Sequence, residues 1–326
     1  MTRRVRHGKL GALRLPMPPG PDREEDEPMT TPAFSGIWPI LYAFFDEQDR
    51  LDEGAVLRQV EACITAGADG IAALGLATEV AKLMPDERAT LLRWLARTVD
   101  GRVPVAVTVF GESEAEQVAF VRMAAELGAS WVILQPPPRR PLPEDELLHF
   151  FGRVIDACPI PAAIQNAPDY LGVGLGDVAI RRLRDRHPNF LLLKGEGSAV
   201  SIRRTIDALK GEVAVFNGRG GLELPDILRA GCAGMIPAPE LVDVQVAIWR
   251  ATQAGEWAEA DRLYAEVLPL IVFVMQSIPH LVTYGKRAAA HRLGLGPVHD
   301  RAPGDLPTPF GLAVLDRLLA PLPPLL

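Results

Sequence analysis

Short unbroken apolar runs alternate along the chain with longer stretches in which apolar residues recur every three to four positions. The first pattern is typical of buried strands and the second indicates amphipathic helices. The runs predict strands at Ile37–Phe45, Gly70–Leu74, Val103–Val109, Trp131–Leu134, Ala162–Ile164, Phe190–Leu193, Val213–Phe216 and Gly234–Ile236. The periodic stretches predict helices at Glu53–Ala66, Asp86–Val99, Ser113–Leu127, Glu144–Ala157, Gly176–Arg186, Ser198–Leu209, Leu222–Ala230 and Glu240–Ala254.

The order of these elements predicts the fold. Eight strand–helix units over about 220 residues favour an α/β protein with a parallel (β/α)8 barrel, the TIM-barrel fold. A doubly wound open sheet is the alternative, but no Gly-x-Gly-x-x-Gly follows the first strand. After Gly255 the pattern is purely helical and predicts a C-terminal helical extension, with helices at Glu256–Met275, Pro279–Leu293 and Phe310–Leu319.

Three segments follow from this pattern. Residues 1–33 are rich in Pro, Arg and acidic groups, and we expect them to be disordered. Residues 34–255 form the predicted barrel, and residues 256–326 form the helical segment. Met29 stands just before the globular pattern begins, so we hypothesise that translation starts there, which N-terminal sequencing of native protein checks.

Composition excludes several classes of protein. The 326 residues are 48% hydrophobic, carry a net charge of −7 and contain no basic tract, which argues against a nucleic-acid partner. No apolar run reaches the length of a membrane span, and the first 28 residues lack the apolar stretch of a signal peptide. Cys63, Cys158 and Cys232 lie far apart without Cys-x-x-Cys spacing. We therefore expect a cytoplasmic protein with no membrane partner, disulfide or zinc site.

Lys194 is the most informative single residue. The chain has 34 basic residues, of which only five are Lys, and this one ends the buried run Phe190–Leu193. Burying an ammonium is costly unless it is paired or loses its proton. Lys194 is therefore either ion-paired, with Glu196 as the nearby carboxylate, or an amine that attacks a ketone to form a Schiff base.

In a TIM barrel the active site lies at the carboxyl ends of the strands, so the residues at these ends are candidate active-site residues. Lys194 is the candidate nucleophile among these ends, and the absence of His there gives a Ser-His-Asp triad or a histidine metal cluster no support. The polar and loop residues at these ends are Tyr42, Thr78, Glu79, Gln135, Gln165, Asn166, Lys194, Glu196, Asn217, Gly218 and Pro237.

Four motifs accompany the strand-six lysine: Gly36-Ile-Trp-Pro39, Ala66-Gly-Ala-Asp-Gly70, Gly75-Leu-Ala-Thr-Glu79 and Gln165-Asn-Ala-Pro168. Together they resemble the dihydrodipicolinate synthase/N-acetylneuraminate lyase family of class I aldolases and dehydratases, from Gly36 to the C-terminal helices. The resemblance implies a lysine Schiff base, no cofactor, no metal, a small 2-oxo acid substrate and a homo-oligomer, either a dimer or a tetramer.

The departures from the family pattern bear on the reaction. The acid/base tyrosine of the family is replaced by Gln165, and its two loop threonines by Leu76 and Ala77. The tyrosine pair that crosses a subunit contact falls at Pro137-Pro138, and the carboxylate-binding arginine aligns near Tyr170. These losses argue against dihydrodipicolinate synthase activity itself. Because the prolines replace the crossing tyrosines, we expect each site to be completed within one chain.

One branch of the family is more similar. Gln165-Asn-Ala-Pro168, Thr78-Glu79 and Lys194-Gly-Glu196 are similar to the 2-keto-3-deoxyarabonate and related sugar-acid dehydratases. The resemblance implies a Schiff-base lyase that dehydrates a 2-keto-3-deoxy sugar acid. A pyruvate-dependent aldolase acting on a 2-keto-3-deoxy or 4-hydroxy-2-oxo acid is the second reading. A barrel that binds a 2-oxo acid without catalysis is the third.

The resemblance also implies roles for residues. Lys194 is the nucleophile, Gln165 orients a water or hydroxyl, and Glu196 either holds and titrates the amine or points outward. Ala77 and Thr78 hold the substrate carboxylate, with a turn cap as the alternative for Thr78. Glu79 braces the loop. For the remaining candidates substrate contact is weighed against packing, strand-end or turn roles: Tyr42, Asn166, Tyr170, Asn217 and Gly218.

Overall fold

The computed structural model describes residues 34–325, and the expectations for residues 1–33 lie outside this range. Eight strands form one parallel sheet in the order β1-β8-β7-β6-β5-β4-β3-β2. The strands are β1 Gly36–Ile37, β2 Ile71–Ala73, β3 Val105–Val109, β4 Trp131–Leu134, β5 Ala162–Asn166, β6 Phe190–Gly195, β7 Ala214–Asn217 and β8 Gly234–Met235.

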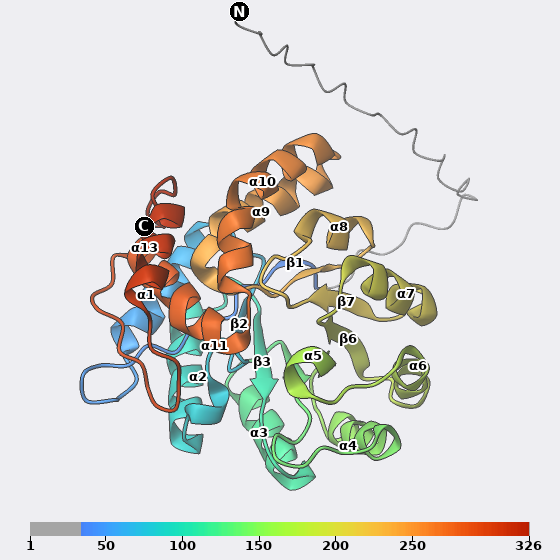
Figure 1. Ribbon diagram of the computed structural model, residues 1–326. Coiled ribbons are helices and arrows are strands. Elements are labelled where there is room, and N and C mark those ends of the chain that lie inside the picture. The colour runs from blue at the N-terminus through green and yellow to red at the C-terminus, as the bar shows by residue number, and fades with distance from the viewer. Residues whose placement is uncertain (1–33, 326) are drawn as a thin grey trace, which may run out of the picture. The chain divides into compact units, whose positions relative to one another are not determined.

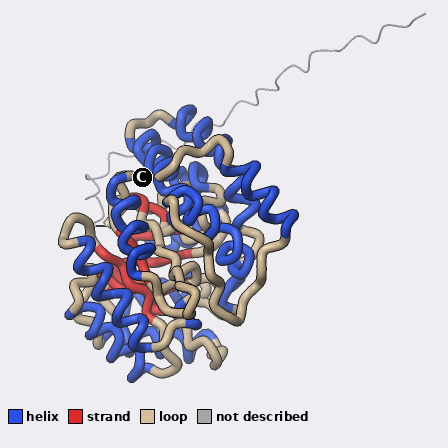
Figure 2. The backbone as a smooth tube through the Cα atoms, turned by 90° about the vertical axis from the view of Figure 1, so that its left-hand side faces the viewer, coloured by secondary structure: helices blue, strands red, loops and turns tan. Residues whose placement is uncertain are grey.

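The sheet closes on itself between β1 and β2. Ile40, just after β1, forms a parallel bridge with Ala72 of β2. The Ala72 N–H donates to the Pro39 carbonyl at 2.9 Å, and the Leu41 N–H donates to the Ala72 carbonyl at 3.0 Å. Closure removes the two free edges that an open sheet would leave. The predicted (β/α)8 barrel is therefore confirmed, and Figure 2 shows the strands enclosed by helices.

Helices follow the strands and cover the outside of the barrel (Figure 1). Asp52, Ser113 and Ser198 cap α1, α3 and α7 by accepting hydrogen bonds from backbone N–H groups of the first turn. The covering helices are α1 Glu53–Thr65, α2 Pro85–Val99, α3 Glu114–Glu126, α4 Glu144–Asp156, α5 Pro168–Leu171, α6 Asp177–Arg186, α7 Ala199–Leu209, α8 Leu224–Arg229 and α9 Val242–Gln253, with short 3-10 turns η1 Val80–Lys82 and η2 Pro239–Leu241.

Aromatic side chains fill the interior of the barrel. Trp38, Trp131 and Phe216 are almost completely buried there. The ring centroids of Trp38 and Trp131 lie 5.4 Å apart, and those of Trp131 and Phe216 lie 5.6 Å apart. The barrel is thus a packed core without a channel, which leaves the carboxyl ends of the strands as the place for a site.

Two strands are longer than the sequence predicts, and the first strand is shorter. β5 and β6 extend beyond their apolar runs to Asn166 and Gly195, and Gln165 pairs with Lys194 in the ladder. Ladder pairing uses only backbone groups, so polar side chains at a strand end are hidden from a prediction based on apolar runs. Conversely, the predicted strand Ile37–Phe45 shortens to Gly36–Ile37 followed by isolated bridges. Three candidate residues, Gln165, Asn166 and Lys194, thereby lie on strands and not on loops.

The chain after residue 255 is helical, as predicted: α10 Trp257–Val274, α11 Ile278–His280, the π-helix η3 Leu281–Gly285, α12 Lys286–Leu293 and α13 Pro309–Leu319. The boundary between barrel and extension at residue 255 stays a prediction. Among the described residues no single helix has the length and apolarity to cross a membrane, although the bent pair Trp257–Val274 and Ile278–Leu293 passes by length and composition.

The close pairing of β8 with β1 predicts a sensitive glycine. A Cβ on Gly234 would overlap the backbone of Gly36, the residue with which it pairs. We expect Gly234→Ala to lower the free energy of unfolding by ~1–3 kcal/mol, because the two strands must separate to admit the methyl group. Urea denaturation measures the loss. Gly296→Ala, where a Cβ would meet open space, is the control, and equal stability of both variants would contradict the prediction.

Candidate active site

Lys194 and Glu196 form a buried ion pair at the end of β6. Lys194 Nζ lies 3.0 Å from Glu196 Oε1, and the two side chains are 4% and 2% exposed. The carboxylate therefore points toward the amine and not outward. The ion pair that the sequence offered as one interpretation of Lys194 is present, and it places a potential proton acceptor directly beside a potential nucleophile.

Two glutamine amides extend this pair across neighbouring strands. Gln165 Nε2 donates to Glu196 Oε1 at 2.5 Å, and Gln135 Nε2 donates to Gln165 Oε1 at 2.7 Å. Amides cannot transfer protons at neutral pH, so their role is to orient the carboxylate and satisfy its hydrogen bonds. Gln135 follows β4 and carried no assigned role in the sequence analysis, although its place at a strand end was the available signal.

The strand-seven candidates hold the segment that carries the ion pair. Asn217 Nδ2 donates to the carbonyls of Gly195 and Gly197 at 3.1 and 3.0 Å. A Cβ on Gly218 would lie 2.5 Å from Lys194 Cε and 2.8 Å from Glu196 Oε1, closer than real Cβ atoms approach. For Asn217, substrate contact was weighed against a turn role, and the contacts favour the structural role because the amide nitrogen donates to the backbone. Gly218 is the residue that admits the lysine.

A small cavity of about 20 Å³, here called the inner chamber, adjoins the ion pair. Lys194 and Glu196 are the only titratable side chains among the described residues that line it. No cluster of three or more potential metal ligands occurs anywhere in residues 34–325. The lining consists of Ile40, Leu76, Ala77, Lys194, Glu196, Gly218, Gly220, Ile236, Ala238, Met275, Ile278 and Leu281.

The loop after β2 places Ala77 at this chamber and turns Thr78 away from it. Thr78 is fully buried, and its hydroxyl donates to the Leu41 carbonyl at 2.6 Å. The expectation that this hydroxyl donates to a substrate carboxylate is therefore corrected, because its proton is already committed to the fold. Backbone groups of the loop remain for that role.

Glu79 braces the same loop, as expected. Its carboxylate is ion-paired with Lys82 at 2.5 Å and with Lys286 of α12. Lys286 is fully buried, and burial lowers its pKa while Glu79 opposes that shift. The pair ties the loop to the C-terminal helices, and removing either partner would leave an uncompensated buried charge.

Tyr42 belongs to a separate buried pair. Its hydroxyl donates to Glu240 Oε2 at 3.0 Å, and Tyr42 does not line the inner chamber. Burial raises the pKa of Tyr42, and it raises the pKa of Glu240 to about 7. Of the two readings of Tyr42, the contacts favour packing over replacement of the acid/base phenol.

The remaining candidates lie after β5. The Asn166 amide donates to the Leu175 carbonyl at 2.9 Å and accepts from the Leu175 N–H at 2.8 Å, so it fixes the following loop. Tyr170 of α5 is half-buried, and burial raises its pKa while the Arg219 guanidinium opposes the shift. Sequence reasoning missed Arg219, because it lies in the loop after β7 and only the closed barrel brings it to the tyrosine.

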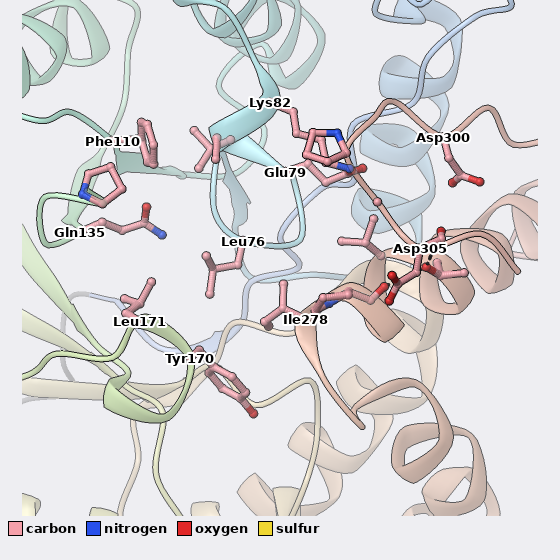
Figure 3. A pocket seen from close by; sticks show the side chains of 18 of the residues that line it. Leu76, Glu79, Lys82, Phe110, Gln135, Tyr170, Leu171, Ile278, Asp300 and Asp305 are labelled. Carbon is pink, nitrogen blue, oxygen red and sulfur yellow. Dashed lines mark hydrogen bonds and ion pairs between the residues drawn. The ribbon is translucent and has the colours of Figure 1, made fainter. Parts of the chain in front are cut away.

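A larger cavity of about 370 Å³, here called the vestibule, adjoins the inner chamber, since Leu76 and Ile278 line both. Figure 3 shows Leu76 and Ile278 between Gln135 and Tyr170 on one side and Asp300 and Asp305 of the C-terminal loop on the other. The site is thus a small reactive chamber reached through a wider opening.

Glu240 predicts a pH dependence of stability. Its folded pKa of about 7 exceeds the ordinary value of 4.5, so its stabilising contribution is present below about pH 4.5 and is lost as pH rises through 7. The shift corresponds to about 3 kcal/mol. Glu240→Gln keeps an acceptor for Tyr42 without a charge.

We therefore expect the stability of Glu240→Gln relative to the wild type to increase between pH 4.5 and 8, as followed by urea denaturation. Glu47→Gln, at an exposed position, is the matched control. Parallel pH profiles for Glu240→Gln and the wild type would contradict the assignment.

Known proteins are similar to this chain in sequence and fold. The chain is 32% identical over 251 residues to an L-2-keto-3-deoxyarabonate dehydratase of Azospirillum brasilense, covering 74% of this chain and 80% of that protein. It is 27% identical over 242 residues to the putative 2-dehydro-3-deoxy-D-gluconate aldolase YagE of Escherichia coli K12, covering 73% and 80%.

The crystal structure of YagE in complex with pyruvate superposes with a TM-score of 0.82 at 26% identity, covering 89% of this chain and 99% of that one. The family model described as the dihydrodipicolinate synthetase family matches residues 33–303. Relatives in that family thus include dehydratases and aldolases of keto-deoxy sugar acids. With this match over most of its length, the chain belongs to the dihydrodipicolinate synthetase family of lyases.

Proposed function

We propose that this protein is a lyase in which Lys194 forms a Schiff base with a small 2-oxo acid, and that it dehydrates a 2-keto-3-deoxy acid. The observation that carries the proposal is the buried Lys194 amine, 3.0 Å from Glu196 at the carboxyl end of the barrel. The similarity to a 2-keto-3-deoxyarabonate dehydratase supports the choice of reaction.

The first step joins amine and ketone. Glu196 takes a proton from the Lys194 ammonium, and the free Nζ attacks C2 of the substrate. Glu196 returns its proton to the former carbonyl oxygen, which leaves as water, so an iminium forms at C2 and the carboxylate is ionised again. Gln165 and Gln135 hold the carboxylate in place through their 2.5 and 2.7 Å hydrogen bonds while this proton moves.

The second step removes water from the substrate. The iminium draws electrons from the C3–H bond, Glu196 accepts the C3 proton, and the same carboxyl group returns a proton to the C4 hydroxyl as it departs. A water then hydrolyses the iminium and restores Lys194, so one water is lost overall. We assign both transfers to Glu196 because it is the only carboxylate among the described residues that line the inner chamber.

The substrate carboxylate has backbone partners in the loop after β2. Among the described residues no backbone carbonyl accepts a hydrogen bond from the N–H of Ala77 or Thr78, and both residues are buried. Buried N–H groups without a partner are costly in an empty site and favour an anionic ligand. We assign these two N–H groups to the substrate carboxylate.

The homo-oligomer expected from the family resemblance remains a proposal.

Trapping with borohydride tests the Schiff base. After incubation with pyruvate and borohydride, we expect intact mass spectrometry to show one pyruvyl adduct on the wild type. The same adduct is expected on Lys210→Arg, a control at an exposed position. Lys194→Arg keeps the cation but cannot form the adduct, so none is expected. An adduct on Lys194→Arg would place the chemistry elsewhere, and no adduct on the wild type would favour an ion pair without catalysis.

Replacing the carboxylate tests the proton transfers. We expect Glu196→Gln to lower kcat for dehydration by about 10²-fold or more, because no general base then faces C3. The pyruvyl adduct is expected to persist, because Lys194 is retained. An unchanged kcat would exclude Glu196 as the base.

Product analysis separates the two lyase reactions. Dehydration yields an unsaturated 2-oxo acid of the same carbon number. Cleavage of the C3–C4 bond, the reaction named for YagE, yields pyruvate and an aldehyde and requires the base at the C4 hydroxyl instead. Mass spectrometry of the products therefore distinguishes a dehydratase from an aldolase.

A further inference from the structure

The wall of the vestibule is dominated by apolar side chains from six separate parts of the chain. They come from the loop after β2, the ends of β3 and β4, α5, the α11–η3 turn and the C-terminal loop. The apolar residues are Leu76, Val80, Ala81, Phe110, Pro136, Pro137, Pro138, Leu171, Ile278, Pro279, Val282 and Pro303. Figure 3 shows Leu76, Leu171 and Ile278 around the middle of this space.

Most polar side chains of the wall are already engaged by the protein. Asp300 is ion-paired with Arg287 at 2.5 Å, and the Lys82 ammonium contacts Glu79 at the same distance. The Thr283 hydroxyl lies 2.9 Å from the Pro279 carbonyl. A polyhydroxylated chain entering this space would lose water at each hydroxyl and find few free partners, which is unfavourable.

The sizes of the two cavities indicate which part of a substrate lies here. The inner chamber has about 20 Å³ of free space beside Lys194, whereas the vestibule has about 370 Å³. A 2-oxo acid bound to Lys194 reaches the vestibule by extending the carbons beyond C4 past Leu76 and Ile278, which line both cavities. The vestibule volume lies within the ordinary range of small-molecule sites.

We propose that the vestibule selects 2-oxo acids whose distal end is apolar, so that a 4-hydroxy-2-oxo acid with an alkyl or aryl tail is preferred to one with a chain of hydroxyls. This inference rests on the proposed Schiff-base function of Lys194 and specifies its substrate class. The proposed substrates differ from the sugar acids named for the relatives. The difference is inferred from the apolar wall of the vestibule in this chain.

A pair of acids with one carbon skeleton tests the preference. 4-Hydroxy-2-oxohexanoate and 4,5,6-trihydroxy-2-oxohexanoate differ only in the hydroxyls at C5 and C6. We expect kcat/KM to favour the first by roughly tenfold or more, mainly through KM. The same comparison is made on borohydride-trapped adducts, so that the preference is measured even where neither acid is converted. Equal values, or a preference for the trihydroxy acid, overturn the proposal.

Variants of the wall locate the effect. Val282 of η3 lines the vestibule, whereas Val178 of α6 is 76% exposed and lines neither cavity. Val282→Asn, and the isosteric Val282→Thr as a milder replacement, should lower the selectivity for the apolar tail severalfold, whereas Val178→Asn should leave it unchanged. An unchanged ratio in both Val282 variants would place the tail elsewhere and overturn the proposal.

Failure of this inference is distinguishable from failure of the proposed function. A Lys194-dependent pyruvyl adduct together with a preference for the trihydroxy acid retains the Schiff-base lyase and removes only the apolar selection. No adduct with pyruvate or with either hexanoate removes both, because no substrate then reaches Lys194.

Discussion

The buried ion pair between Lys194 and Glu196 sets the conditions for the surrounding site. Charges that leave water are tolerated only when they are paired and their remaining hydrogen-bonding capacity is met. Gln165 meets it for the carboxylate, and Asn217 holds the backbone on both sides of Glu196. A Cβ on residue 218 would overlap the lysine side chain where it lies. One electrostatic requirement thus accounts for residues on β5, β6 and β7.

A second buried pair connects the barrel with the C-terminal helices. Glu79, in the loop after β2, is paired with Lys286 of α12, and Arg292 of the same helix is bonded to Asp243 of α9 at 2.7 Å. These contacts hold the C-terminal segment over the carboxyl end of the barrel, where Ile278 and Val282 become walls of the vestibule. The extension therefore bears on the proposed substrate preference and is more than an addition to the fold.

At the position of a side chain that transfers protons in the family, this site has an amide that only orients its neighbours by hydrogen bonds. Where the resemblance places the acid/base tyrosine of the family, Gln165 supplies an amide that cannot ionise, and Tyr42 is held by Glu240 outside the inner chamber. This leaves Glu196 beside the amine as the group to which the proposed mechanism assigns its proton transfers. Such an arrangement suits an elimination in which one carboxyl group serves neighbouring carbons in turn.

The sequence by itself determined the barrel, because apolar runs and helical periodicity alternate eight times and each run must be buried. It also singled out Lys194, since a lone lysine ending a buried strand requires a partner or a reaction. Only the tertiary structure decided which side chains meet it. Glu196 was open to two orientations, the Thr78 hydroxyl turned to Leu41, and Arg219 reached Tyr170 from a distant loop. Strand pairing and the direction of each side chain arise from closure of the barrel, which brings together residues that no local pattern relates.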